Sequence, residues 1–187
     1  MTNSATIGVG DLTDRMHGLI GELRTVVGRG LAPDLTAALV GEVLAPHLQS
    51  ADLLTEAQQV GDPDCYRQHL LHADQDGSLS VVALVWLPGQ GTSIHDHLSW
   101  CATGVHLGQE SEVRYRLVPD GGTARLVATG EFVNEPGSVC GFAPPGDIHL
   151  VRNSGTSTAI SLHVYGADVS RLGSSVRRVY QLPADER

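Results

Sequence analysis

The sequence has few basic residues. It contains only 12 Lys and Arg against 21 Asp and Glu, which gives a net charge of -9. Proteins that bind nucleic acid or an anionic membrane surface need a basic patch, so neither partner is expected. Long apolar runs are also missing: no segment approaches the roughly 20 residues that span a bilayer, and the first residues do not resemble a secretion signal. We therefore expect a protein of the cytoplasm.

Cysteine is scarce as well. The three cysteines, Cys65, Cys101 and Cys140, are odd in number and form no C-x-x-C pair. Neither a disulfide framework nor a cysteine-based zinc site is therefore expected, and the thiols should be reduced.

The length and the hydrophobic content suit one domain. The 187 residues are 41% hydrophobic, which is enough for one sizeable core, and no linker, repeat or low-complexity stretch divides the chain. From Asp11 to about Gln59 apolar residues recur at three- and four-residue spacing, which predicts two or three short helices within residues 11–60. Pro33 lies where a first helical turn tolerates proline.

Residues 64–182 have a different pattern. Short β-prone runs occur at 66–71, 78–86, 103–107, 112–118, 124–127, 139–142 and 159–165. The breaks between them carry Gly, Pro, Asp or Asn, as in DQDG, PGQG and NEPG. Many short strands with close turns predict a mainly β sandwich or barrel with the helices packed outside it, as a single domain over residues 1–187.

Three histidines suggest a metal site. Residues two apart on a strand point to the same face, so His95 and His97 can grip one ion while Asp96 faces away. His149 follows a Pro-Gly turn into a new strand and is the best candidate for a third ligand. Nine histidines in a chain of this length also produce an H-x-H pair by chance fairly often, so the surrounding residues have to decide.

Two stretches around these histidines resemble the two motifs of the cupin superfamily. The matching residues are Gly89, His95, His97 and Gly108 for the first motif and Pro144, Gly146, His149 and Asn153 for the second. The resemblance implies a cupin double-stranded β-helix, a jelly-roll barrel, with a short N-terminal helical segment outside. Most cupins place a glutamate ligand after H-x-H, whereas this chain has Cys101.

The missing carboxylate affects the choice of metal. Three neutral imidazoles leave the full charge on a divalent ion and leave coordination sites open, which suits Fe²⁺ binding a thiolate and O₂ side by side. A zinc ion with three histidines and one water is the competing arrangement.

The three-histidine pattern without the glutamate resembles the cysteine dioxygenase family, which includes 3-mercaptopropionate dioxygenases. The segments CYRQHLLHAD, VVALVWLPGQGTSIHDH, GDIHLVRN and SLHVYG carry the resemblance from about Tyr66 to Gly166. The family's Ser, His and Tyr near the metal correspond to Ser161, His163 and Tyr165, which alternate along one strand and share a face. The resemblance implies that the Tyr165 hydroxyl, held by the other two, hydrogen-bonds bound oxygen or substrate. The same alternation could also form only a polar wall of the barrel.

The resemblance also indicates which residues select the substrate. In this family the residue two positions after a tyrosine is arginine in the enzymes best known for cysteine and glutamine in the 3-mercaptopropionate group. Tyr66 and Gln68 match the glutamine-type bacterial branch and are the expected substrate-binding residues. Arg171 or Arg177 could instead anchor a substrate carboxylate, and their spacing does not choose between them. Arg67 is another candidate anchor, but strand alternation places it on the face opposite Tyr66, where a solvated surface arginine is expected.

Two roles remain open for Cys101. In animal members of the family a cysteine near this position bonds covalently to the active-site tyrosine, whereas many bacterial members have glycine there. Cys101 therefore either crosslinks to Tyr165 or fills a small slot in the core.

These observations predict an Fe²⁺-dependent thiol dioxygenase that adds both atoms of O₂ to the sulfur of a small thiol carboxylate, 3-mercaptopropionate or L-cysteine, and gives a sulfinate. Its expected partners are that thiol and O₂, with no obligate protein partner, and no motif for a flavin or a nicotinamide cofactor is visible. Two other functions remain open: another metal-dependent cupin enzyme, such as a carbon-bond-cleaving dioxygenase or an isomerase, and a non-catalytic cupin that binds a small molecule.

Overall fold

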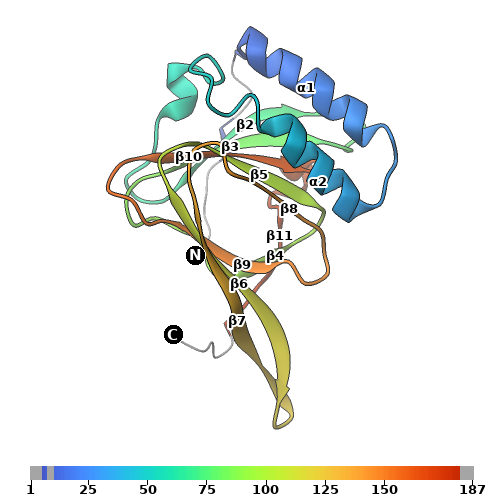
Figure 1. Ribbon diagram of the computed structural model, residues 1–187, viewed down its shortest axis with the longest axis vertical. Coiled ribbons are helices and arrows are strands. Elements are labelled where there is room, and N and C mark those ends of the chain that lie inside the picture. Colours follow the sequence, from blue (N-terminus) through green and yellow to red (C-terminus); the bar gives the residue numbers. More distant parts are fainter. Residues whose placement is uncertain (1–5, 8–10, 182–187) are drawn as a thin grey trace.

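Two β-sheets face each other in the structure, a computed structural model that describes residues 6–7 and 11–181 (Figure 1). The first sheet contains, in order, β1 (Thr6–Ile7), β2 (Arg67–Ala73), β3 (Ser80–Trp86), β10 (Ala159–Tyr165), β5 (Cys101–Leu107) and β8 (Val139–Phe142). The second contains β11 (Val176–Val179), β4 (His95–His97), β9 (Ile148–Asn153), β6 (Glu110–Asp120) and β7 (Thr123–Asn134). All pairings are antiparallel except the short parallel contact of β1 with β2.

Strands β3 and β10 lie in the middle of the first sheet and are buried on both faces. Every residue of SVVALVW and of AISLHVY is buried, as expected where helices cover one face of a sheet and the barrel interior the other. Because side chains alternate, Val81, Ala83 and Val85 pack toward the helices, while Leu84 and Trp86 point into the barrel. The same alternation sends the polar residues of β10 inward.

The helices lie on the outer face of the first sheet (Figure 1). The two helices on this face are α1 (Asp14–Val27) and α2 (Pro33–Leu44). The 3-10 turn η1 (Glu56–Gln59) follows them in sequence, and the short α3 (Val169–Leu172) comes near the C-terminal end of the described chain. Thr13 is the N-cap of α1, and its side chain accepts a hydrogen bond from the Met16 backbone N–H. Pro33 occupies the first turn of α2. Buried leucines such as Leu23 and Leu44 pack these helices onto the sheet. The expected fold class, a mainly β cupin barrel with N-terminal helices outside, is therefore confirmed.

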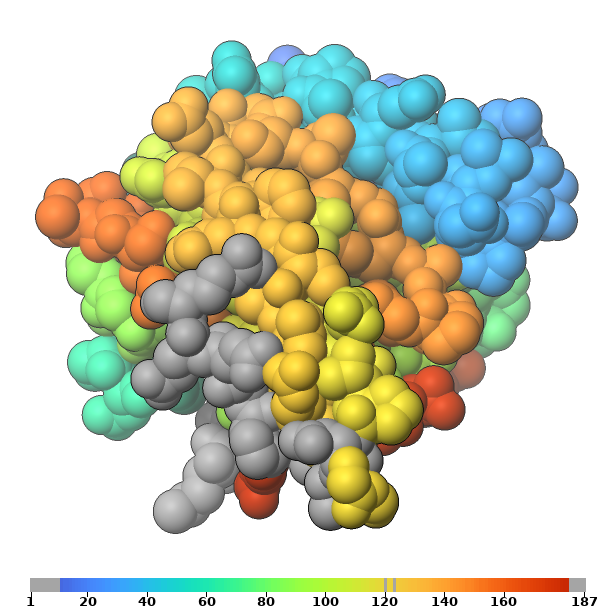
Figure 2. Space-filling view, turned by 60° about the horizontal axis from the view of Figure 1, so that its bottom comes forward, coloured from blue at the N-terminus to red at the C-terminus, as the bar shows by residue number. Residues whose placement is uncertain are grey.

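The hairpin of β6 and β7 extends past the barrel (Figure 1). Its yellow and gold atoms run along the near face in Figure 2. Both strands are longer than the sequence pattern predicts, because the hairpin continues into solvent, where apolar alternation is weak. The pattern also did not predict β1, α3 or β11. In the described part of the chain, no helix is both long enough and apolar enough to cross a membrane.

Candidate metal centre and pocket

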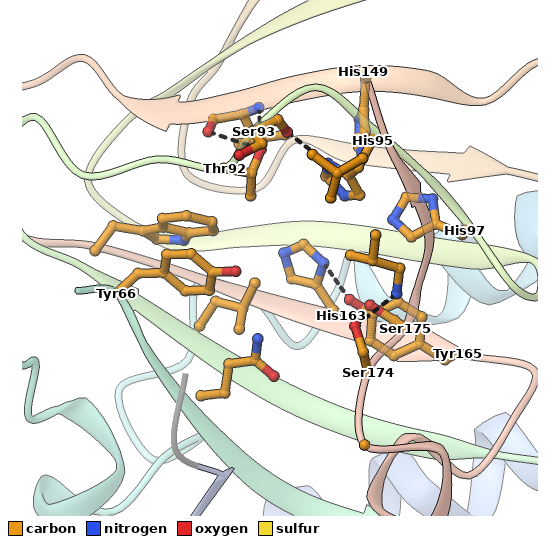
Figure 3. A pocket seen from close by; sticks show the side chains of 17 residues that line it. Tyr66, Thr92, Ser93, His95, His97, His149, His163, Tyr165, Ser174 and Ser175 are labelled. Carbon is orange, nitrogen blue, oxygen red and sulfur yellow. Dashed lines mark hydrogen bonds between the residues drawn. The ribbon is translucent and has the colours of Figure 1, made fainter. Parts of the chain in front are cut away.

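Three buried histidines meet at the inner face of the second sheet. His95 and His97 come from β4 and point the same way, and His149 on β9 is the register partner of His95. One ring nitrogen from each lies within 4.8 Å of the others. Figure 3 shows the three rings converging at one end of a pocket. The structure thus brings together the three residues that the sequence suggested as ligands.

Each imidazole is oriented by an acceptor at its Nδ1 atom. The contacts are His95 Nδ1 to the Ser93 carbonyl oxygen at 3.0 Å, His97 Nδ1 to Asp147 Oδ2 at 3.0 Å, and His149 Nδ1 to Glu112 Oε1 at 2.8 Å. A carbonyl oxygen or an ionised carboxylate only accepts, so Nδ1 must carry the proton in all three rings. The Nε2 lone pairs are therefore left for a metal, which is the usual arrangement of metal-binding histidines.

The electrostatics keep two of these rings, His95 and His149, in the form that binds metal. Burial, reinforced by His149 and His97, lowers the pKa of His95 to about 3. Burial also lowers the pKa of His149, although its hydrogen bond to Glu112 opposes that effect. Both imidazoles are therefore neutral at pH 7 and need lose no proton to act as ligands.

The two carboxylates behind the rings stay ionised despite being buried. Burial raises the pKa of Glu112, but hydrogen bonds from His149 and Arg114 outweigh it, and the net pKa lies below the usual value. At Asp147, hydrogen bonds from the side chain and backbone of His97 outweigh burial in the same way. The negative charge needed near a dication is thus supplied by the groups that hold the ligands, and the donor set of three imidazole nitrogens fits a first-row divalent ion such as Fe²⁺.

The pocket beside the histidines carries no charged carboxylate or guanidinium. Among the described residues that line it, none is Arg, Lys, Asp or Glu. The apolar wall consists of Leu84, Trp86, Val151, Val176 and Val179. The polar lining beyond the three metal-facing histidines includes Tyr66, Gln68, Thr92, Ser93, His163, Tyr165, Ser174 and Ser175. The site therefore suits a small molecule held by neutral hydrogen-bonding groups.

The polar residues of β10 form a connected chain at the pocket wall. The Tyr165 hydroxyl oxygen lies 3.3 Å from His163 Nδ1, and His163 Nε2 lies 3.0 Å from Ser161 Oγ. Burial lowers the pKa of His163 to about 3 and raises the pKa of Tyr165 well above its ordinary value. The imidazole is therefore neutral and the phenol protonated at pH 7. Figure 3 shows both rings facing the metal-side histidines.

Tyr66 and Gln68 both line the pocket, as strand alternation predicts. The Tyr66 ring lies against Trp86, with ring centroids 4.4 Å apart, and its hydroxyl interacts with the Gln68 amide. The two polar groups thus form one patch of the lining, and Figure 3 shows Tyr66 across the pocket from the three histidines.

The three arginines considered as anchors lie outside the set of lining residues. Arg67 pairs with Asp62 at 3.2 Å, and Arg171 pairs with Asp168 at 3.0 Å with a largely exposed side chain. Arg177 is exposed on β11. A substrate carboxylate in the described pocket would therefore meet Tyr66 and Gln68 before any of these guanidinium groups.

Cys101 is buried directly opposite Tyr165 in the pairing of β5 with β10. Burial raises the pKa of its thiol well above the ordinary value, and the thiol lies within hydrogen-bond reach of the Tyr165 hydroxyl. This placement is compatible with either role, a crosslink or a filler of the core. Cys65 and Cys140 are partly buried, and no disulfide joins the three cysteines, all of which lie in the described part of the chain.

Sequence reasoning missed the residues that orient the ligands. Glu112 lies on β6, where the pairing of Arg114 with His149 brings it beside the His149 ring. Asp147 lies two residues before His149 but orients His97 instead. The one signal that the sequence offered was strand alternation. Asp147 stands two positions before His149, and Glu112 stands two positions after another acidic residue, Glu110, so each shares a face with a polar neighbour.

Comparisons with known proteins show what this chain is similar to. A family model described as cysteine dioxygenase type I matches residues 46–174. Among solved structures, TT1209 of Thermus thermophilus is 22% identical over 64% of this chain and 97% of its own, with a TM-score of 0.45. A double-stranded β-helix protein from Klebsiella pneumoniae is 18% identical over 64% of this chain and 88% of its own, with a TM-score of 0.46. The cupin domain of an XRE-family transcriptional regulator from Enterobacter cloacae is 17% identical over 56% of this chain and 98% of its own, with a TM-score of 0.38.

Proposed function

Because the chain belongs to the cysteine dioxygenase type I family, we propose that it is an iron-dependent thiol dioxygenase. It adds both atoms of O₂ to the sulfur of a small thiol carboxylate and gives a sulfinate. All four electrons come from the sulfur, so no second reductant is needed. The observation that carries the proposal is the group of three buried, Nδ1-anchored histidines with no carboxylate among them, open to a pocket that also holds a tyrosine hydroxyl.

The three histidines would hold the metal. Bound Fe²⁺ would supply a Lewis acid that lowers the pKa of the substrate thiol and brings sulfur and O₂ together. The protein's own part is to fix the direction of His95, His97 and His149, which Glu112, Asp147 and the Ser93 carbonyl do through Nδ1.

The pocket wall beside the histidines positions the reacting groups. The Tyr165 hydroxyl, which is protonated at pH 7, can hydrogen-bond the sulfur or an oxygen atom during transfer. His163 fixes the direction of that hydroxyl through its Nδ1 atom. Leu84, Trp86 and Val151 exclude water from the same space, which strengthens these interactions.

The neutral lining favours a thiol carboxylate without an α-amino group, such as 3-mercaptopropionate, over L-cysteine. The ammonium group of cysteine would find no carboxylate among the described lining residues. The carboxylate of either thiol can accept hydrogen bonds from the Tyr66 hydroxyl and the Gln68 amide, but not the two-pronged ion pair that an arginine makes. Removing the amino group therefore avoids burying an unpaired charge.

The test is oxygen uptake by protein loaded with Fe²⁺ under anaerobic conditions. We expect 3-mercaptopropionate to be consumed with a higher kcat/KM than cysteine or cysteamine, with the sulfinate identified by mass spectrometry. Gln68→Arg should shift the ratio toward cysteine by about ten- to a hundred-fold, the size of one charge-assisted contact. Oxygen uptake that does not depend on thiol would refute the proposal. Cysteine as the better substrate by about tenfold, with a ratio unchanged in Gln68→Arg, would refute the role of Gln68.

A further inference from the structure

A buried carboxyl group lies behind the Ser161–His163–Tyr165 chain. Glu110 begins β6, is only 3% exposed, and belongs neither to the pocket lining nor to the three-histidine group. Its carboxyl interacts with the Ser161 hydroxyl and the Trp86 indole N–H, while Oε1 has no hydrogen-bond partner in the described structure. Placing a carboxyl in the core is costly, so its position behind these residues needs a physical explanation.

Ser161 is the junction that links this carboxyl to the pocket. Its Oγ atom is 3.2 Å from the Trp86 Nε1–H, which can only donate, and 3.0 Å from His163 Nε2, which can donate or accept. The other ring nitrogen of His163 meets the Tyr165 hydroxyl at 3.3 Å. Hydrogen bonds therefore run from Ser161 through His163 to the hydroxyl that faces the metal site, and the Glu110 carboxyl interacts with the Ser161 end of this chain.

The number of protons that these groups carry determines which group donates and which accepts in each hydrogen bond. An ionised Glu110 only accepts, so Ser161 donates to it and accepts from both Trp86 and His163 Nε2–H. His163 Nδ1 then has a free lone pair, and the Tyr165 O–H donates to it. In that state the oxygen of Tyr165, and not its proton, is presented to the pocket.

A neutral Glu110, or an apolar side chain in its place, reverses the two bonds that join Ser161 to His163 and His163 to Tyr165. Ser161 still accepts from Trp86 but now donates to His163 Nε2, which places the ring proton on Nδ1. His163 Nδ1–H then donates to the Tyr165 oxygen, and the Tyr165 O–H is free to donate into the pocket. The two states differ by one proton at Glu110 and by the direction of one hydroxyl at the reaction site.

We propose that Glu110 is a positioning residue whose carboxyl group selects the tautomer of His163 and thereby decides whether Tyr165 offers a donor or an acceptor to the bound substrate. The inference rests on the proposed function only for its catalytic consequence. The tautomer itself is a property of the protein that can be measured without iron, thiol or O₂.

The environment of Glu110 makes both states accessible near neutral pH. Burial raises the pKa of Glu110 to about 7, and the negative charge of Glu112 on the same strand adds to the effect. The Ser161 hydroxyl and the Trp86 N–H oppose it by stabilising the carboxylate. The neighbouring His163 is neutral throughout this range, so its tautomer rather than its charge responds.

The experiment is nitrogen NMR of metal-free protein labelled with ¹⁵N-histidine, in which the two ring nitrogens of a neutral histidine differ in chemical shift according to which carries the proton. The His163 signals are assigned by their loss in His163→Gln. At about pH 8.5 we expect mainly the Nε2–H tautomer, and at about pH 5.5 mainly the Nδ1–H tautomer. The ratio should change by about tenfold or more, as expected for one charge-assisted hydrogen bond.

Variants separate this link from general effects of pH. Glu110→Leu should give the Nδ1–H tautomer at both pH values, and Ser161→Ala should make the tautomer independent of pH. Glu131→Leu, which removes an exposed carboxylate from the neighbouring strand β7, should behave like the native protein. If Glu110→Leu does not fold, the His163 tautomer ratio of the native protein at the two pH values, compared with that of Ser161→Ala, still tests the inference.

A His163 tautomer that is the same at both pH values in the native protein would overturn the inference, as would an Nε2–H tautomer in folded Glu110→Leu. Either result would leave the proposed function intact if thiol-dependent oxygen uptake is observed. Conversely, the expected tautomer switch without any oxygen uptake would refute the proposed function alone.

Discussion

Replacing Glu112 tests how far the protein, rather than the histidines alone, determines metal affinity. Glu112 Oε1 accepts from His149 Nδ1 at 2.8 Å, and its other oxygen accepts from Arg114 at 3.0 Å. Glu112→Gln keeps a carbonyl acceptor of the same size but removes the charge. A hydrogen bond to a charged group contributes about 1.5–3 kcal/mol and a neutral one about 0.5–1.5, so the change should cost about 1 kcal/mol, or roughly fivefold in affinity.

Glu112→Ala removes the acceptor altogether and leaves His149 free to rotate or change tautomer. Loss of such a partner typically weakens metal binding by about 10- to 100-fold, which corresponds to about 1.4–2.8 kcal/mol. The assay is titration of metal-free protein with Co²⁺ against a chelating indicator, with Glu131→Gln as the control for loss of one negative charge on the neighbouring strand. If Glu112→Ala binds Co²⁺ as tightly as the control, Glu112 does not orient a ligand and the assignment of His149 would be in doubt.

Three further changes test other parts of the site. His149→Ala should abolish tight metal binding with an unchanged circular dichroism spectrum, whereas His106→Ala, whose ring faces the Leu48 carbonyl on the helix side, should bind metal normally; equal losses would contradict the assignment. Tyr165→Phe should lower kcat by about 100-fold with iron content unchanged, and parallel loss of iron would indicate a structural role instead. Because the pKa of Glu110 is raised from 4.5 to about 7, the native protein should lose about 3 kcal/mol of stability relative to Glu110→Gln as pH rises through that range, measured by urea unfolding without metal. A difference that does not vary with pH would contradict this.

The parts of the fold and site that follow from local periodicity could be predicted from the sequence. Alternation along a strand requires His95 and His97 to share a face, and the same rule places Ser161, His163 and Tyr165 together. The many short β-prone runs with close turns predicted a mainly β barrel, and the absence of a linker after the helical part predicted that the helices pack outside it. The roles of these residues in catalysis stay predictions.

The orienting residues could not be predicted, because they depend on contacts between distant strands. Glu112 reaches His149 only through the register of β6 with β9, and Asp147 reaches His97 across 50 residues of sequence. The pocket wall formed by residues 173–176 depends on the pairing of β11 with β4, and the sequence there has Gly and Ser but no apolar alternation. Register between distant strands is set by the packing of the whole barrel, which no local pattern records.

Incorporation of ¹⁸O₂ tests the central claim most directly. Protein loaded with Fe²⁺ is given 3-mercaptopropionate and ¹⁸O₂, and the product is analysed by mass spectrometry together with the amounts of O₂ and thiol consumed. The account predicts a sulfinate that carries two ¹⁸O atoms, formed with one O₂ per thiol. Formation of disulfide with hydrogen peroxide, or of a product with a single ¹⁸O atom, would contradict it.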